Sequence, residues 1–277
     1  MVAETDSFMR RHHFLLRRLH SLAGIAPIGL FLLSHLTTNS SIVWGLFNKS
    51  EFAEGHAGAA TFQHEVNFIH SLPFLLLIEV FGLWLPIAFH AILGIYYASS
   101  SSPNLKHYPH QDNWRYTLQR ISGYIGVLFI FYHVATLRWG WTFLIPGGTH
   151  WDGAYAASTL AQILQGGADG MTTGGIIVSV SYMIGVSLLV FHLANGLWTA
   201  AITWGITISA PAQKRWGYVC AALGVALMVM AWSAVIGFAT LDPVQARAGE
   251  DQVNHTQQTA PAPMTADATT HSFGKGE

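Results

Sequence analysis

The chain has 277 residues, of which 51% are hydrophobic and 10% are charged, and its formal net charge is −1. Soluble domains carry about 25% charged residues, so this composition, with a mean hydropathy of +0.37, indicates a membrane protein. The near-zero net charge excludes the basic surface that nucleic-acid binding requires. The lone cysteine, Cys220, excludes a disulfide framework, an iron–sulfur cluster and covalently attached haem.

In chain order, five apolar stretches are long enough to cross a membrane, because a hydrocarbon core of about 30 Å needs about 20 helical residues. They cover residues 21–43, 72–98, 121–145, 174–204 and 216–241. Pro27 and Pro86 lie inside two of these stretches, where neighbouring helices satisfy the carbonyl groups that proline frees. We therefore predict an all-α fold, a five-helix transmembrane bundle that forms one membrane domain over residues 1–241.

The last part of the chain, residues 242–277, is rich in Ala, Thr, Pro, Gln and Asp. Such a composition offers too little apolar surface to order a segment by burial. We predict that residues 242–277 form a flexible tail.

Lysine and arginine are distributed unevenly between the two sides of the predicted bundle. One side holds Arg10, Arg11, Arg17, Arg18, Lys106, Arg115, Arg120, Lys214 and Arg215, and the other holds Lys49, Arg138, Arg247 and Lys275. Cytoplasmic loops carry the excess of positive charge. We therefore expect a multi-pass protein of the cytoplasmic (inner) membrane, with its N-terminus in the cytoplasm and its C-terminal tail outside.

Four histidines lie deep inside four different apolar stretches: His35, His90, His133 and His192. With a rise of about 1.5 Å per residue, the first and third lie roughly 22 and 20 Å from the cytoplasmic boundary. The second and fourth each lie roughly 27 Å from the outer boundary. Because successive helices alternate in direction, the depths predict an outer pair, His35 with His133, and an inner pair, His90 with His192.

Two buried imidazoles at one depth suit a haem iron. Two axial histidines fill both open positions of the iron, which favours electron transfer over oxygen binding. The arrangement predicts two non-covalent b-type haems in a four-helix core. A single histidine could instead be hydrogen-bonded across helices, and one zinc site is excluded because the two depths differ by more than a ligand bond of about 2 Å. Gly94 and Gly196 either let a porphyrin approach or serve close helix packing.

Basic residues near the haem depths are candidate partners for the haem propionates, because arginine binds carboxylates bidentately. Arg17, Arg18, His20 and Arg120 are candidates on the inner side, and Arg138 is the candidate on the outer side. The alternative for each is ordinary anchoring by positive charge on the cytoplasmic side.

Six segments of the sequence resemble the dihaem cytochrome b membrane-anchor subunit of succinate dehydrogenase and fumarate reductase, the five-helix type associated with menaquinone. They are R-R-L-H-S-L-A-G (17–24), F-L-L-S-H-L-T-T-N (31–39), H-S-L-P-F (70–74), L-P-I-A-F-H-A-I-L-G-I-Y (85–96), N-W-R-Y-T-L-Q-R-I-S-G (113–123) and F-H-L-A-N-G-L-W-T-A-A-I-T-W-G-I-T (191–207). The resemblance runs from about residue 14 to 240 and leaves out the loop 146–173 and the tail. It implies that the same four histidines bind haem iron.

The resemblance also implies partners: a flavoprotein and an iron–sulfur protein on the cytoplasmic face, and a membrane quinone, menaquinone in this type. The chain itself would not act on succinate but would carry electrons and bear the quinone site. Quinone reduction takes up protons, so an acid/base group is expected near one haem. Glu65, beside His64 in the predicted outer loop, is the candidate, and Glu79 is an alternative that needs a partner of its own.

Two other functions compete with this interpretation. The cytochrome b subunit of a hydrogenase or formate dehydrogenase also uses membrane histidines, although the H-S-L-P-F and F-H-L-A-N-G-L-W segments argue against it. A transporter could use the buried histidines to relay protons. A spectrum that shows haem would exclude the transporter.

Overall fold

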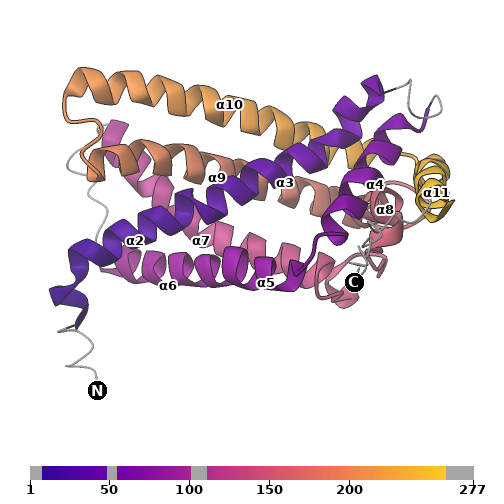
Figure 1. The fold of residues 1–277 in the computed structure, drawn as a ribbon, viewed down its shortest axis with the longest axis horizontal. Helices are drawn as coiled ribbons and strands as arrows, with labels where there is room; N and C mark the ends of the chain where they lie inside the picture. The colour runs from indigo at the N-terminus through magenta and orange to yellow at the C-terminus, as the bar shows by residue number, and fades with distance from the viewer. Residues whose placement is uncertain (1–7, 49–54, 101–110, 260–277) are drawn as a thin grey trace, which may run out of the picture.

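The computed structural model describes residues 8–48, 55–100 and 111–259, which form helices without β-strands (Figure 1). Five helical segments of this part are long and apolar enough to span a membrane. They are His13–Phe47, which contains α2 (His13–Ile25) and α3 (Pro27–Trp44); Leu75–Ser99, which contains α5 (Leu75–Glu79) and α6 (Leu85–Ser99); Trp114–Leu137 within α7 (Gln111–Leu137); α9 (Thr173–Thr203); and α10 (Ala210–Thr240). The predicted all-α five-helix transmembrane fold is confirmed.

The spans pack into a bundle in which the α2–α3, α5–α6, α7 and α9 segments carry the four deep histidines. α9 contacts α7 and α10, and α2 contacts α6 and α9. The fifth span, α10, packs against α3 and α9, so the histidine-bearing helices form a four-helix group with α10 on its outside (Figure 1). We call the end where α2 begins the N-terminal end of the bundle.

Large apolar side chains cover the outside of the spans. Exposed examples from each span are Leu30, Leu76, Ile92, Leu128, Ile177 and Val225. Exposed apolar surface on this scale marks contact with lipid.

Pro27 and Pro86, the two prolines expected inside spans, each lie next to an irregularity of the helix. The first span is divided at Ala26, and α3 begins at Pro27, whose missing N–H is tolerated in a first helical turn. In the second span a π-helix, Val80–Trp84, joins α5 to α6 just before Pro86. A π-turn places an extra residue in the turn, and such turns accommodate a broken α-helical hydrogen bond.

The third span ends earlier than the predicted 121–145. α7 ends at Leu137, and Gly140 follows in a left-handed conformation with φ of 69°, which stops the helix. Residues 142–144 continue as an isolated 3-10 turn instead of a membrane helix. The sequence stays apolar past the end of the helix because it includes Trp139, Trp141 and Phe143. Trp141 contacts the other two rings at the end of the bundle. Aromatic residues are enriched at membrane interfaces.

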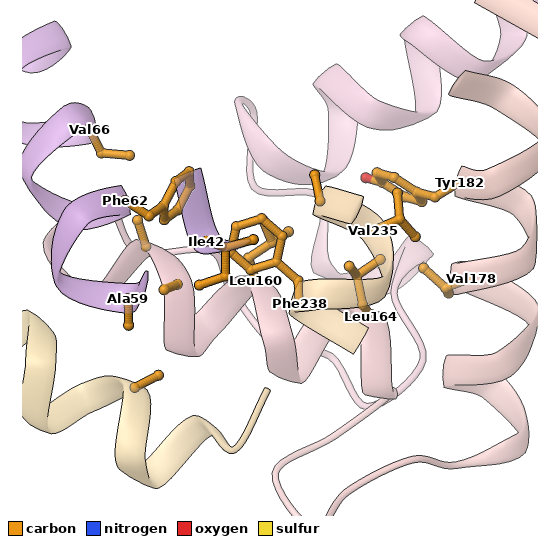
Figure 2. Close-up of a cluster of buried hydrophobic side chains, with 14 residues drawn as sticks. Ile42, Ala59, Phe62, Val66, Leu160, Leu164, Val178, Tyr182, Val235 and Phe238 are labelled. Atoms are coloured by element: carbon orange, nitrogen blue, oxygen red, sulfur yellow. The ribbon is translucent and has the colours of Figure 1, made fainter. Parts of the chain in front are cut away.

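Three shorter helices form a cap at the other end of the bundle: α4 (Ala57–His70), α8 (Ala156–Gln165) and α11 (Pro243–Thr259). They contact one another and lie together opposite the start of α2 (Figure 1). Figure 2 shows their shared core, where Phe62 and Phe238 meet edge to face, with ring centroids 4.9 Å apart, beside Leu160. The same core reaches Tyr182 in α9, so the cap and the spans form one packed unit.

The prediction of a flexible tail from residue 242 is wrong for residues 243–259, which form α11. Ala246, Glu250 and Val253 are 2%, 0% and 4% exposed, and their spacing places them on one face of that helix. A short buried face was sufficient to order a segment whose average composition is polar. The rest of the tail, 260–277, and the sequence-predicted topogenic residues Lys49, Lys106 and Lys275 lie outside the described residues.

Candidate functional site

The four deep histidines meet as two pairs at two levels of the bundle. His35 in α3 and His133 in α7 have ring centroids 5.7 Å apart, with their planes at 88°. His90 in α6 and His192 in α9 have centroids 6.0 Å apart, with their planes at 82°. The structure therefore brings together the same partners that the depth estimate paired. We call them the cap-end pair and the N-terminal-end pair.

The spacing within each pair fits one metal ion between two imidazoles. Metal–imidazole bonds of about 2 Å put the two ligand nitrogens about 4 Å apart, and the ring centroids, which lie behind the nitrogens, at about 6 Å. Among the described residues no group of three or more His, Cys, Asp or Glu is placed to hold a metal ion by itself. A haem fits a two-histidine donor set, because the porphyrin supplies the other four ligands of its iron.

Hydrogen bonds fix the rings of the N-terminal-end pair. The Nδ1 atom of His90 lies 2.9 Å from the carbonyl oxygen of His20, and that of His192 lies 3.1 Å from the carbonyl oxygen of Gln119. The hydroxyl of Ser122 is also 3.1 Å from His192 Nδ1. A carbonyl oxygen accepts, so each Nδ1 carries the proton, and each Nε2 is left with the lone pair that a metal ligand needs.

Aromatic packing holds the cap-end pair instead. Phe31 stacks on His35 with centroids 5.2 Å apart, and Phe129 stacks on His133 at 6.0 Å. Tyr182 adds an edge contact to His133 at 5.8 Å. The Nδ1 atom of His133 is buried and has no hydrogen-bond partner within the described ranges. This nitrogen therefore lacks the carbonyl acceptor that orients each ring of the N-terminal-end pair.

The absence of a side chain at Gly24 and Gly123 leaves the space that the rings of His90 and His192 occupy. A Cβ atom at Gly24 would lie 2.5 Å from Cε1 of His90, and one at Gly123 would lie 3.2 Å from Cε1 of His192. Of the two glycines that the sequence indicated, Gly94 lies against His20, with a Cβ distance of 3.2 Å, whereas a Cβ at Gly196 would make an ordinary contact at 3.6 Å. Gly24 and Gly123 were not predicted from the sequence, although each is the last residue of a segment that carries the resemblance.

Replacing Gly24 with alanine is expected to displace the His90 ring and to weaken haem binding at the N-terminal-end pair by about 5- to 150-fold. The new methyl group would overlap a ring that is fixed from both sides, and overpacking of this kind costs about 1–3 kcal/mol. Haem content per chain, measured on the purified variant, checks this expectation. Gly196→Ala is the matched control and should retain full haem content; equal content in both variants would contradict the steric argument.

Of the candidate propionate residues of the inner side, His20 lies directly against the N-terminal-end pair. His20 stacks on His90 with centroids 4.0 Å apart, and its Nδ1 is buried without a partner in the described chain. Arg17 lies over the ring of Tyr97, which also contacts His20. Arg18 lies over Trp204, and Arg120 lies over Tyr116.

Arg138, the outer propionate candidate, binds a protein carboxylate. Its Nη2 donates to Oε2 of Glu79 at 2.8 Å. Glu79 therefore has the partner that a charged residue inside a span requires. Glu65, the candidate acid, lies in α4 within the cap, so it is part of a helix instead of the irregular loop expected before the second span.

Sequence reasoning missed a group of polar residues between α7 and α9. Arg115, Gln119 and Ser122 lie on α7, and Asn195 lies on α9, one turn from His192. Asn195 is only 4% exposed and Ser122 is fully buried. The sequence feature that could have identified them is their polarity within an apolar span, because polar side chains inside a membrane are usually hydrogen-bonded.

A curated relative matches most of the chain. The chain is 32% identical over 225 residues to the succinate dehydrogenase cytochrome b558 subunit of Bacillus subtilis (strain 168), and the match covers 81% of this chain and 96% of that protein. Neither a protein-family model nor a solved structure matches the chain.

Proposed function

Since the chain belongs to the family of cytochrome b membrane-anchor subunits of succinate dehydrogenase, we propose that it carries electrons between an iron–sulfur protein and a membrane quinone through two b-type haems. The observation that carries this proposal is the presence of two facing histidine pairs, with ring centroids 5.7 and 6.0 Å apart, at two levels of one bundle. A proton-relay transporter does not require such paired spacing.

His90 and His192 would hold the inner haem, and His35 and His133 the outer haem. Each haem, when bound, supplies a one-electron centre. The protein contributes axial ligation, ring orientation and a water-poor environment. At the inner level the ligands are oriented by hydrogen bonds to the carbonyl groups of His20 and Gln119, and at the outer level by stacking on Phe31 and Phe129.

The N-terminal end of the bundle is proposed to face the cytoplasm and the cap to face outside. Arg17, Arg18 and Arg120 all lie at the N-terminal end, in agreement with the preference of positive charge for the cytoplasmic side. The flavoprotein and iron–sulfur subunits of the complex would then dock at this end, close to the inner haem, and His20, Arg17, Arg18 and Arg120 would bind its propionates.

A spectrum and a subunit analysis test this function. Purified complex should contain two b-type haems per chain, visible in the reduced-minus-oxidised spectrum, and should include a flavoprotein and an iron–sulfur protein. Protein without haem would overturn the proposal, and co-purification with a hydrogenase or formate dehydrogenase would favour the competing cytochrome b function.

Glu65 is the proposed proton donor and acceptor for the quinone, which in this family type would be menaquinone. Glu79 is the weaker candidate because Arg138 already engages it. Replacing Glu65 with glutamine is expected to reduce quinone-linked turnover by about 100-fold or more, since general acid–base groups contribute about 10²–10⁴-fold. Steady-state assays with a soluble quinone analogue measure this loss.

Both haem spectra of the Glu65→Gln variant should remain those of the wild type. Glu79→Gln serves as the comparison and should retain most of the quinone activity. Wild-type turnover in the Glu65 variant would remove this residue from the quinone site.

A further inference from the structure

A chain of hydrogen bonds runs from the N-terminal end of α7 to His192. The Nε atom of Arg115 donates to Oδ1 of Asn195 at 2.9 Å, and Nδ2 of Asn195 donates to Oε1 of Gln119 at 2.8 Å. The other end of the Gln119 amide, Nε2, donates to the backbone carbonyl of His192 at 3.1 Å. All these bonds cross between α7 and α9.

Gln119 holds His192 at two points. Its side chain binds the backbone carbonyl of His192, and its own backbone carbonyl lies 3.1 Å from Nδ1 of the same histidine. Ser122, one turn further along α7, donates its hydroxyl to the Gln119 carbonyl and lies 3.1 Å from His192 Nδ1. The tautomer and the orientation of the ring therefore depend on where Gln119 lies.

Asn195 and Arg115 fix Gln119 in turn. Asn195 uses both ends of its amide and is 4% exposed, so a change there leaves a buried polar group unpaired. The guanidinium of Arg115 is itself held, 3.7 Å from the centroid of the Trp198 ring. At the cap-end pair, Asn39 donates its Nδ2 to the backbone carbonyl of His35 at 2.8 Å and lies 3.4 Å from His35 Nε2, whereas the Nδ1 atom of His133 has no partner in the described part of the chain.

We propose that Arg115, Asn195, Gln119 and Ser122 act as positioning residues that set the reduction potential of the inner haem through His192. This inference rests on the proposed function. A ligand histidine whose Nδ1–H is hydrogen-bonded is the more basic ligand. The stronger ligand stabilises the oxidised iron, so weakening this bond raises the midpoint potential.

Redox titration of the purified complex tests the proposal, with the outer haem as an internal reference. Ser122→Ala, which removes an acceptor at Nδ1 without altering charge, is expected to raise the midpoint potential of the inner haem. Gln119→Leu and Asn195→Leu are expected to raise it as well, and the outer haem should keep its wild-type potential. If Gln119→Leu loses the inner haem, the other two variants carry the measurement.

Two controls separate positioning from a general packing effect. Thr199→Val removes a hydroxyl one turn from Asn195 that bonds only to the backbone of its own helix, so it should shift neither haem. Because Asn195 acts through Gln119, adding Asn195→Leu to Gln119→Leu should produce no further shift, which is a non-additive double-mutant cycle.

The outcomes distinguish this inference from the proposed function. A complex that binds two haems, but whose inner potential is the same in Ser122→Ala, Asn195→Leu and Thr199→Val, would overturn the positioning role alone. Additive shifts in the double variant would overturn the relay through Gln119. A wild-type complex without the inner haem would contradict the proposed function and this inference together.

Discussion

Alanine at either His90 or His192 is expected to remove the inner haem and leave the outer haem bound. Alanine at His35 or His133 should remove the outer haem alone. Each substitution deletes one of two axial ligands at one level, and the rings of different levels are not in contact. Haem content should fall from about two to about one per chain, measured by pyridine haemochrome assay with low-temperature spectra to identify the remaining haem.

His20→Ala is the control that this experiment needs, because the His20 ring contacts His90 more closely than His192 does, with centroids 4.0 Å apart against 6.0 Å. The parallel stacking of His20 on His90 leaves no space for an iron between the two rings. His20→Ala therefore removes a proposed propionate contact but no iron ligand, and it should retain both haems. Loss of the same haem from the His35 and His90 variants would contradict the pairing.

Replacing Glu250 with alanine is expected to destabilise the cap by about 2–5 kcal/mol, because buried donors left without partners cost about 1–3 kcal/mol each. The Glu250 carboxylate is fully buried and accepts the backbone N–H groups of Ala157 and Ser158, at 2.6 and 2.9 Å, in the first turn of α8. Its second oxygen accepts the Ser158 hydroxyl at 2.6 Å. Amide hydrogen exchange in α8 and α11 would measure the loss.

Glu250→Gln is the matched variant, since its amide oxygen can still accept both N–H groups. Burial raises the pKa of the Glu250 carboxyl above its usual range, and the bonds from Ser158 and Ala157 offset only part of this effect. A raised pKa in the folded state means that folding favours the protonated form. Its stabilising contribution is complete below the ordinary pKa of about 4.3 and declines as the pH rises through the raised value.

Hydrogen exchange of the cap should therefore become faster with rising pH in the wild type, after correction for intrinsic exchange. The Glu250→Gln variant should lack this component of the pH dependence. An identical pH dependence in both proteins would show that protonation of Glu250 does not affect the stability of the cap.

The pairing of the deep histidines could be predicted from the sequence because it depends only on depth and on helix direction. A rise of about 1.5 Å per residue fixes the depth of His35 or His192 whichever way the helix is rotated. The stacking of His20 on His90 could not be predicted in this way, since it depends on how α2 and α6 are rotated about their axes and on the space left at Gly24.

The ordered cap was not predictable from local patterns. One of the buried positions of α11 is Glu250, which a hydropathy pattern counts as exposed. Its burial depends on the free N–H groups of α8, about 90 residues away. The ion pair between Arg138 and Glu79 likewise joins residues from two spans. Such contacts are visible only after the helices are placed in space.

The π-turn in the second span, at Val80–Trp84, determines the directions in which the side chains of Glu79 and His90 point. Glu79 and His90 are eleven positions apart, and eleven residues complete about three turns, so an uninterrupted α-helix would aim both in nearly the same direction. The extra residue in the turn at Val80–Trp84 rotates everything after it by about 100°. Glu79 can then meet Arg138 at the rim while His90 points at His192 in the interior. One helix thus keeps two angular phases. Deleting the extra residue would leave ten regular steps of about 100° between the two positions, which still keeps them about 80° apart.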